Sequence, residues 1–263
     1  MTEAPGLFVS FEGIDGSGKS TQARLLADRL RGLGREVVLT REPGGSPGAE
    51  EIRRLVLTGD RARWSPETEI LLFTAARRDH LERTIRPALS RGAVVVTDRF
   101  ADSTRLYQGT TRGDLRALVD RLHSLMIGLE PDLTVVIDMD PAQALARSLE
   151  RLGARPEPAP SAIALQEVLE AMRSPAEESL DPDATLPSAG GVALPGTTGP
   201  DGAALPEDRF ETFGLPFQER IRQGFLDLAR EDPARIVLID GDRPEADVAA
   251  DVARTALARL DRA

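Results

Sequence analysis

One short stretch near the N-terminus has the residue types and the spacing that bind the phosphates of a nucleoside triphosphate. Residues 13–20 read Gly-Ile-Asp-Gly-Ser-Gly-Lys-Ser and match the pattern G-x-x-x-x-G-K-[ST], after a strand-like apolar run and at the start of a predicted helix. Glycines let backbone N–H groups turn toward anionic oxygens, and the helix N-terminus adds partial positive charge. Lys19 would then reach the β- and γ-phosphates, and the Ser20 hydroxyl could hold Mg²⁺.

Lys19 is the only lysine of the chain, and all other Lys/Arg positions are arginines. A compact ammonium fits inside such a loop, where a forked guanidinium would be too large. A second lysine would also be needed for the Asn-Lys-x-Asp loop with which GTPases recognise guanine. The composition therefore argues against a GTPase.

Polar residues that could bind an acceptor follow two other apolar runs. Arg41 and Glu42 precede a Pro-Gly-Gly turn, and Asp98 is followed by an arginine. Phe73 and Arg77 lie four residues apart on a predicted helix and so share one face. A flat ring beside a bidentate donor suits a nucleobase, whereas a single phenylalanine is more often part of a core. The residues alone leave both interpretations open.

Strand-like and helical stretches alternate along the chain, and they must position these residues. The order is typical of a parallel sheet covered by helices on both faces, with ligands beyond the carboxyl ends of its strands. We therefore expect a three-layer α/β fold of the P-loop NTPase type with a five-stranded parallel sheet. The expected strands are Leu7–Phe11, Glu36–Thr40, Ala93–Asp98, Leu133–Asp138 and Arg235–Asp240. The expected helices are Lys19–Arg31, Ala49–Leu57, Glu67–Leu89, Asp114–Ile127, Pro141–Leu152, Pro216–Arg230 and Pro244–Leu260.

Length and composition limit what the chain can be. Its 263 residues, 41% of them hydrophobic, are enough for one enzyme-sized domain, which we expect over residues 1–263. A formal net charge of −10 argues against binding nucleic acid or an anionic membrane through the overall field. The absence of cysteine excludes disulfide scaffolds, thiolate zinc sites and cysteine nucleophiles. With no signal-like N-terminus and no long apolar run, we expect a soluble cytoplasmic protein.

Residues 156–206 differ from the rest of the chain in composition. They contain eight acidic residues, one arginine and nine of the 19 prolines, and no aromatic residue. Such a segment buries too little apolar surface to repay the entropy of ordering, so we expect a largely flexible insertion. Apolar residues from Leu165 to Met172 recur with helical spacing after Ser161, and they predict a short helix over residues 161–173.

Five motifs in order give the chain a specific resemblance to bacterial thymidylate kinases. They are FEGIDGSGKSTQ, TREPGG, LLFTAARRDHL, the block from DRF to YQG, and EDRFE at Glu207–Glu211. The resemblance covers about Leu7–Arg155 and Glu207 onward. It leaves the acidic insertion unexplained, because bacterial members usually have only a few residues there. It implies formation of dTDP from dTMP and ATP with Mg²⁺, a mobile lid over ATP, and a homodimer.

Carried over by position, the resemblance implies where dTMP binds. Phe73 would stack on thymine, Arg77 would hydrogen-bond the base, and Thr104 and Gln108 would complete the base pocket. Tyr107 would lie near C2′ of the sugar and disfavour a ribose hydroxyl. The other expected substrate contacts are Asp15, Arg41, Glu42, Arg99 and Glu211.

The resemblance also implies which groups surround the phosphates. Arg99 would bind the acceptor phosphate between the two nucleotides, and Asp15 would face the 3′-hydroxyl or the metal shell. Asp98 would hold Mg²⁺ through water, so that Ser20 and Asp98 are the expected metal ligands. The residues expected at ATP are Gly13, Asp15, Gly16, Ser17, Gly18, Lys19, Ser20, Thr21 and Arg147.

A lid helix is expected over residues 141–155. Arg147 and Arg151 lie four residues apart and so project from one face, a pattern that a solvated basic stripe would share. In the eukaryotic branch of the family an arginine occupies the position of Gly16, so the resemblance is to the bacterial type, in which the lid supplies the arginine. Arg151 is the candidate for the transferring group and Arg147 for adenine. The insertion leaves the place of Arg155 open.

The implied acceptor needs no general base, because a phosphate monoester has a second pKa of about 6. His80 and His123 are therefore expected to be surface or helix-packing residues. Catalysis would consist of holding two polyanions in line and neutralising their repulsion through Lys19, Arg99 and Arg151, with Mg²⁺. Two alternatives remain: another P-loop nucleoside monophosphate or deoxynucleoside kinase, and a non-catalytic ATP-binding switch protein.

Overall fold

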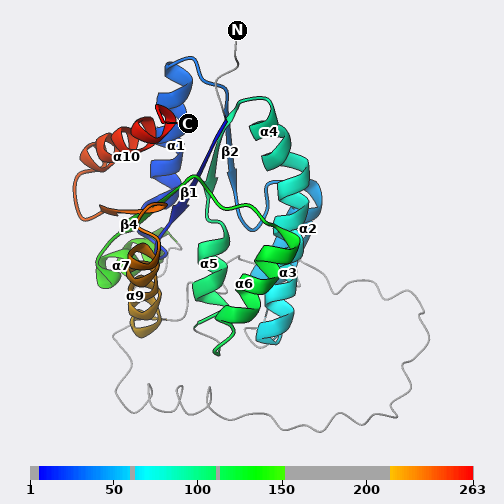
Figure 1. Cartoon of the computed structure of the whole chain (residues 1–263). Helices are drawn as coiled ribbons and strands as arrows, with labels where there is room; N and C mark the ends of the chain where they lie inside the picture. The colour runs from blue at the N-terminus through cyan, green and yellow to red at the C-terminus, as the bar shows by residue number, and fades with distance from the viewer. Residues whose placement is uncertain (1–5, 60–62, 111–112, 152–213, 263) are drawn as a thin grey trace, which may run out of the picture.

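A five-stranded parallel sheet forms the centre of the molecule (Figure 1). The computed structural model describes residues 6–59, 63–110, 113–151 and 214–262. The strands are β1 Leu7–Glu12, β2 Val37–Arg41, β3 Val94–Asp98, β4 Leu133–Asp138 and β5 Ile236–Asp240. Their order across the sheet is β2-β3-β1-β4-β5, which places β1 in the middle. All five expected strands are confirmed, with ends that differ by at most one residue.

Helices cover both faces of the sheet, so the three-layer arrangement is confirmed (Figure 1). They are α1 Lys19–Gly32, α2 Pro47–Leu57, α3 Pro66–His80, α4 Arg86–Ser90, α5 Ala101–Tyr107, α6 Arg116–Met126, α7 Pro141–Arg151, α9 Leu215–Glu231 and α10 Glu245–Leu260. Helices α1 and α10 lie together on one face of the sheet. Within the described ranges, no helix has the length and apolar composition needed to cross a membrane.

Alternation along β1 explains the two helical layers, because successive side chains of a strand point to opposite faces. Leu7, Val9 and Phe11 pack with residues of α1 and α10. Phe8 packs instead with Leu81 and other residues that follow α3. All of these side chains are buried. The apolar runs are therefore continuous because the parallel sheet is covered on both sides.

One predicted helix is interrupted in the structure, and one helix of the structure was not predicted. The helix expected over Glu67–Leu89 divides into α3, a π-helical turn at Leu81–Ile85 and α4. Pro87 cannot donate a backbone hydrogen bond and its ring crowds the carbonyl four residues earlier, so the helix widens before it. Helix α5 was not predicted. All seven of its residues are buried, and a helix without an exposed polar face lacks the amphipathic pattern.

Candidate active site

The carboxyl ends of β1, β2 and β3 open into a cavity of about 800 Å³. This volume lies in the upper part of the usual range for ligand pockets, about 300–1,000 Å³. The lining comes from the loop after β1, the ends of β2 and β3, and helices α1, α2, α3, α5, α7 and α10. The predicted residues that line it together are Asp15, Gly16, Gly18, Lys19, Ser20, Thr21, Arg41, Glu42, Phe73, Arg77, Asp98, Arg99, Thr104, Tyr107, Gln108 and Arg147.

Two predicted residues of the phosphate-binding loop, Gly13 and Ser17, do not line the cavity. A Cβ on Gly13 would lie 2.6 Å from the carbonyl oxygen of Ile137, at a φ of 136°. The side chain of Ser17 is buried. Both residues therefore shape the loop, and the contacts with ATP expected of them stay predictions.

Lys19 is buried where the loop after β1 meets α1. Its Nζ donates to the Ile14 carbonyl at 2.7 Å and lies 3.9 Å from Oδ1 of Asp15. Burial lowers the pKa of Lys19 to about 8; Arg99 adds to this shift and Asp15 opposes it. The ammonium is thus held by the loop itself, as expected for a phosphate-binding lysine.

The two predicted metal ligands lie side by side. The Ser20 hydroxyl donates to Oδ2 of Asp98, which brings the start of α1 to the end of β3. Mg²⁺ prefers hard oxygen ligands and usually keeps several waters, with only one or two protein groups attached. A hydroxyl and a carboxylate oxygen in direct contact at the cavity wall fit that requirement.

Helix α7 begins against the phosphate-binding loop. Gly16 has a φ of 86°, and a Cβ there would lie 1.9 Å from the carbonyl oxygen of Ala144 on α7. No side chain fits at position 16, so an arginine there is excluded. Arg147, one turn further along α7, lines the cavity and donates from Nη1 to Sδ of Met139 at 3.3 Å. Helix α7 therefore places the positive charge of Arg147 beside the phosphate-binding loop, where Gly16 has no side chain to supply one.

Helix α7 ends at Arg151, whose side chain lies outside the described part of the chain. Arg155, Glu211 and the insertion at residues 156–206 also lie outside it. The roles expected of these residues stay predictions.

Arg99 joins the loop after β1 to helix α5. Its φ of 70° is left-handed, and among the described residues it is the one non-glycine with a positive φ. Its Nη2 binds Oδ1 of Asp15 and donates to Oη of Tyr107 at 3.2 Å. Its Nη1 donates to Oγ of Ser103 at 2.8 Å. The guanidinium is therefore oriented by three side chains of the cavity.

Tyr107 completes this arrangement. Its hydroxyl accepts from Arg99 and donates to Oδ2 of Asp15 at 3.1 Å. Burial raises the pKa of Tyr107 far above its usual value, so the phenol remains a donor. Burial also acts to raise the pKa of Asp15, but Arg99 and Lys19 outweigh it and hold that pKa below its ordinary value. The ring packs edge-on against Phe217 of α9, with centroids 5.7 Å apart.

Phe73 and Arg77 share one face of α3, as predicted, and both line the cavity. Phe73 is 8% exposed and packs against Leu57 of α2. Phe73 therefore packs in a hydrophobic core cluster and also lines the cavity. Nη2 of Arg77 donates to Oγ1 of Thr104 at 2.9 Å and to the Phe100 carbonyl at 3.2 Å.

Glu42 is a buried carboxylate that holds both Arg77 and His80. Its Oε2 accepts from Nε of Arg77 at 2.7 Å, and its Oε1 lies 3.0 Å from Nδ1 of His80. Burial acts to raise the pKa of Glu42, but Arg77 and His80 lower it. His80 is fully buried, and its Nε2 lies 2.8 Å from Oγ1 of Thr40. It was expected to be a surface or helix-packing residue, and these polar contacts were not predicted. Within the described chain, Nη1 of Arg77 has no hydrogen-bond partner and is available to a ligand.

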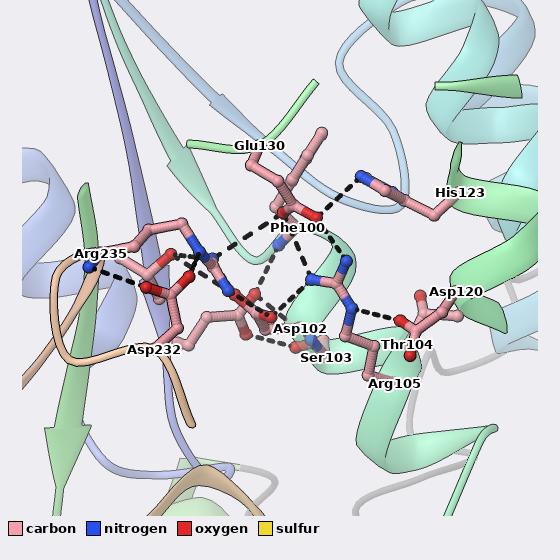
Figure 2. Close-up of polar contacts among 12 residues, drawn as sticks. Phe100, Asp102, Ser103, Thr104, Arg105, Asp120, His123, Glu130, Asp232 and Arg235 are labelled. Carbon is pink, nitrogen blue, oxygen red and sulfur yellow. Dashed lines mark hydrogen bonds and ion pairs between the residues drawn. The ribbon is translucent and has the colours of Figure 1, made fainter. Parts of the chain in front are cut away.

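A second group of charges, with the buried Asp102 at its centre, ties α5 to neighbouring elements (Figure 2). Asp102 lies between two arginines, accepting from Nη1 of Arg105 at 2.7 Å and from Nη1 of Arg235 at 2.6 Å. Arg105 also binds Glu130, and Nε2 of the buried His123 lies 3.1 Å from Oε1 of Glu130. None of these five residues lines the 800 Å³ cavity. The network therefore holds α5 without entering the space for ligands.

Glu12, next to the phosphate-binding loop, is fully buried and was not singled out from the sequence. It accepts hydrogen bonds from the Phe100 backbone N–H at 2.8 Å and from Oγ of Ser103 at 2.5 Å. Burial and the nearby charge of Asp102 raise the pKa of Glu12 to about 7, with Arg99 opposing the shift. Its position directly before Gly13 is the one sequence signal that it carries.

The raised pKa of Glu12 predicts a loss of stability with increasing pH. The pKa is 4.5 in the unfolded reference and about 7 in the fold, so the folded chain binds more protons between these values. This contribution to the free energy of unfolding is about 3 kcal/mol. It is complete below pH 4.5 and is lost as the pH rises to about 7. Chemical unfolding at about pH 5 and pH 8 should show the wild type losing stability relative to Glu12→Gln. An unchanged difference between the two proteins would contradict the shift.

Further lining residues lie outside the predicted set. Arg53 and Leu57 are four residues apart on α2 and share a face, which was an available signal. Nη1 of Arg53 donates to the Pro43 carbonyl at 2.7 Å. Glu150 and Glu245 line the cavity from α7 and the start of α10, and no motif marks them.

Comparisons with known proteins agree with this geometry. A family model described as thymidylate kinase matches residues 11–186. The chain is 59% identical over 252 residues to the thymidylate kinase of Dinoroseobacter shibae, and the alignment covers 96% of each chain. It is 55% identical over 257 residues to the thymidylate kinase of Ruegeria pomeroyi, and that alignment covers 98% of this chain and 97% of the relative. The crystal structure of thymidylate kinase from Ehrlichia chaffeensis aligns with a TM-score of 0.62 and 29% identity, over 96% of this chain and 99% of that one. The resemblance is thus confirmed, and the chain belongs to the thymidylate kinase family.

Proposed function

We propose that ATP binds at the loop after β1 and dTMP between α3 and α5, so that the γ-phosphoryl group passes to the 5′-phosphate of dTMP and leaves dTDP and ADP. Membership of the family makes the phosphorylation of dTMP the reaction of this enzyme. The placement rests on one observation: Lys19, Arg99 and the face of α3 with Phe73 and Arg77 line the same cavity. A phosphate-binding loop alone would identify only the donor.

The chain's own residues would act by binding and by charge, because the acceptor phosphate is mostly ionised at neutral pH. We place Arg99 at the acceptor phosphate, Lys19 at the β- and γ-phosphates, and Arg151 at the transferring group. Asp15 and Tyr107 already orient the guanidinium of Arg99, so little reorganisation is needed during the reaction. The site also accelerates the reaction by holding ATP and dTMP so that the acceptor oxygen and the γ-phosphoryl group are in line.

We place Mg²⁺ at Ser20 and Asp98, with Asp98 acting through a water. The contact between the two side chains supports this placement, as does the preference of Mg²⁺ for oxygen ligands. When bound, the ion would neutralise charge on the β- and γ-phosphates.

For the nucleoside we propose that Phe73 stacks on thymine and that Nη1 of Arg77 hydrogen-bonds the base. Thr104 and Gln108 complete the pocket, and Tyr107 faces C2′ of the sugar. These five residues are all buried and line the cavity, which supports the assignment. The remaining proposed contacts are Arg41, Glu42, Asp15 and Glu211 for dTMP and Arg147 for adenine.

An assay of ADP release with dTMP, dUMP, dCMP and thymidine as acceptors tests this function. We expect dTMP to be turned over fastest and thymidine not to be phosphorylated. Faster turnover of dCMP or thymidine would favour another nucleoside monophosphate or deoxynucleoside kinase. ATP binding without consumption in the presence of any acceptor would favour a switch protein.

Deleting Pro160–Leu205 should leave a folded, active kinase. We propose one domain with a lid over residues 141–155 and an insertion over 156–206. The described elements on either side of the insertion share one core cluster, since Ala144 of α7 and Phe217 of α9 pack within it. Turnover of dTMP and thermal unfolding of the deletion variant measure the effect. An insoluble or inactive product would give the insertion a structural role.

We also propose a homodimer in the cytoplasm, where ATP and dTMP are found. Helices α3 and α6 expose apolar side chains, with Leu71 56% and Leu125 70% accessible in the single chain. Helices α3 and α6 contact each other, and an exposed apolar surface that is contiguous across neighbouring elements marks interaction sites. Light scattering should give twice the 28.4 kDa mass of one chain. A mass of one chain at micromolar concentration would contradict the dimer.

A further inference from the structure

We infer that Glu12 is a positioning residue that holds Arg99, through Ser103 and the backbone after β3, in the orientation that binds the acceptor phosphate. The inference rests on the role proposed for Arg99. Glu12 itself does not line the cavity, so it acts through the arginine and not on a ligand.

The side-chain part of this link is a relay through one hydroxyl. Oγ of Ser103 lies 2.5 Å from Oε2 of Glu12 and 2.8 Å from Nη1 of Arg99. A guanidinium can only donate, so the hydroxyl accepts from Arg99, and above the Glu12 pKa of about 7 it gives its single hydrogen to the ionised carboxylate. The carboxylate therefore fixes the direction in which the hydroxyl offers its lone pair to Arg99. Bonds with a charged partner are the stronger class of hydrogen bond.

The backbone part of the link stabilises an unfavourable conformation. Arg99 has a φ of 70°, which an arginine adopts rarely and at a cost. Its own N–H donates to the Phe11 carbonyl at 2.9 Å, and the next N–H, of Phe100, donates to Oε1 of Glu12 at 2.8 Å. Consecutive residues of β1 thus hold both sides of the left-handed residue. The N–H of Ser103 also donates to Oε1 of Glu12, at 3.3 Å, which attaches the first turn of α5.

Glu12→Gln tests the relay in the full-length protein, because it keeps the shape and replaces the accepting oxygen by a donor. Calorimetry at about pH 8, where Glu12 is ionised, should show dTMP binding weakened by roughly tenfold or more, the effect of losing a hydrogen bond with a charged partner. Thymidine, which lacks the phosphate, should bind within about twofold of the wild type. A carboxylate that acted by charge alone would repel the phosphate, so tighter dTMP binding by Glu12→Gln would overturn the inference.

Ser103→Ala supplies a second test, which does not depend on how the glutamine is accommodated. It should weaken dTMP binding by a similar factor, and the double variant should lose no more than the larger single loss, because both changes break one chain. Additive losses would show that the two residues act separately and would overturn the relay.

Asp102→Asn is the matched control for a general loss of stability. It removes another buried carboxylate, one that contacts Arg105 and Arg235 and lies in the network of Figure 2. Because the charge of Asp102 raises the pKa of Glu12, this variant is also measured at about pH 8, where Glu12 is ionised with or without that charge. We expect lower thermal stability there, with both dissociation constants within about twofold of the wild type. If this variant reproduced the selective loss of dTMP binding, Glu12 would have only a structural role.

Arg99→Met separates failure of the inference from failure of the proposed function. It should abolish the preference for dTMP over thymidine. If it does so while Glu12→Gln leaves that preference unchanged, only the role of Glu12 is overturned. If Arg99→Met leaves the preference unchanged, Arg99 does not bind the acceptor phosphate, and the proposed placement of dTMP fails with it.

Discussion

Lys19→Ala should lower the turnover of dTMP by at least about three orders of magnitude and leave the fold intact. Loss of one preorganised donor typically costs about 10²–10³ in rate, and Lys19 also brings a positive charge to the β- and γ-phosphates. Its contacts, with the Ile14 carbonyl and Asp15, lie within the loop itself, so truncation leaves the packing of β1 and α1 unchanged. ADP release measures the rate, and circular dichroism and thermal unfolding measure the fold.

Binding of dTMP to Lys19→Ala distinguishes lost chemistry from lost structure. The proposed base pocket is formed by residues of α3 and α5, including Phe73 and Arg77, and does not include Lys19. The dissociation constant for dTMP should therefore stay within about twofold of the wild type. Turnover near the wild-type rate would remove the assignment of this loop to ATP.

Arg151→Ala should lower kcat by roughly 10³ and change the KM for dTMP much less, by analogy with other arginines that act on a transferring phosphoryl group. Helix α7 starts against Gly16, where no side chain fits, and it brings Arg147 into the cavity wall. Arg151, the last residue of α7, follows Arg147 by four positions, and that spacing in the sequence is the basis of the role proposed for it. An interaction made mainly in the transition state lowers kcat and kcat/KM together when it is removed.

Two variants control this experiment. Arg151→Lys keeps the charge but loses the planar fork, so we expect it to recover only part of the rate. Arg147→Ala removes the arginine four positions earlier in α7, and it should raise the KM for ATP more than it lowers kcat. A raised KM for dTMP at unchanged kcat in Arg151→Ala would reassign Arg151 to binding of the ground state.

The fold was predictable where burial leaves a simple pattern in the sequence. Runs such as Val94–Val96 are apolar throughout because the sheet is covered on both faces, and the loop motif located β1 and α1. Helix α5 was missed because every one of its residues is buried, so that no exposed face sets a period. The π-helical turn at Leu81–Ile85 was not predicted either, because it depends on how the helix backbone adjusts to the ring of Pro87. The spacing of apolar residues carries no information about that adjustment.

The site was predictable where chemistry demands certain residue types at a fixed spacing, as in the phosphate-binding loop and the pair Phe73 and Arg77. The buried polar contacts of Glu12 and His80 were not predicted, for a different reason. Glu12 contacts Ser103, 91 positions away, and His80 contacts Glu42, 38 positions away. Such contacts are set by the register of β1 on β3 and by the approach of α3 to β2, which a single sequence does not reveal.

The burial of Lys19 has a practical consequence for chemical labelling. Apart from the α-amino group, Lys19 carries the only primary amine in the sequence, and it is 6% exposed at the wall of the cavity. Amine-directed cross-linkers, fluorophores and biosensor surfaces therefore have no lysine on the outside of the protein to attach to. Immobilisation through guanidinium-directed or enzymatic tags is the suitable route, and any acylation of Lys19 would report directly on whether its cavity is occupied.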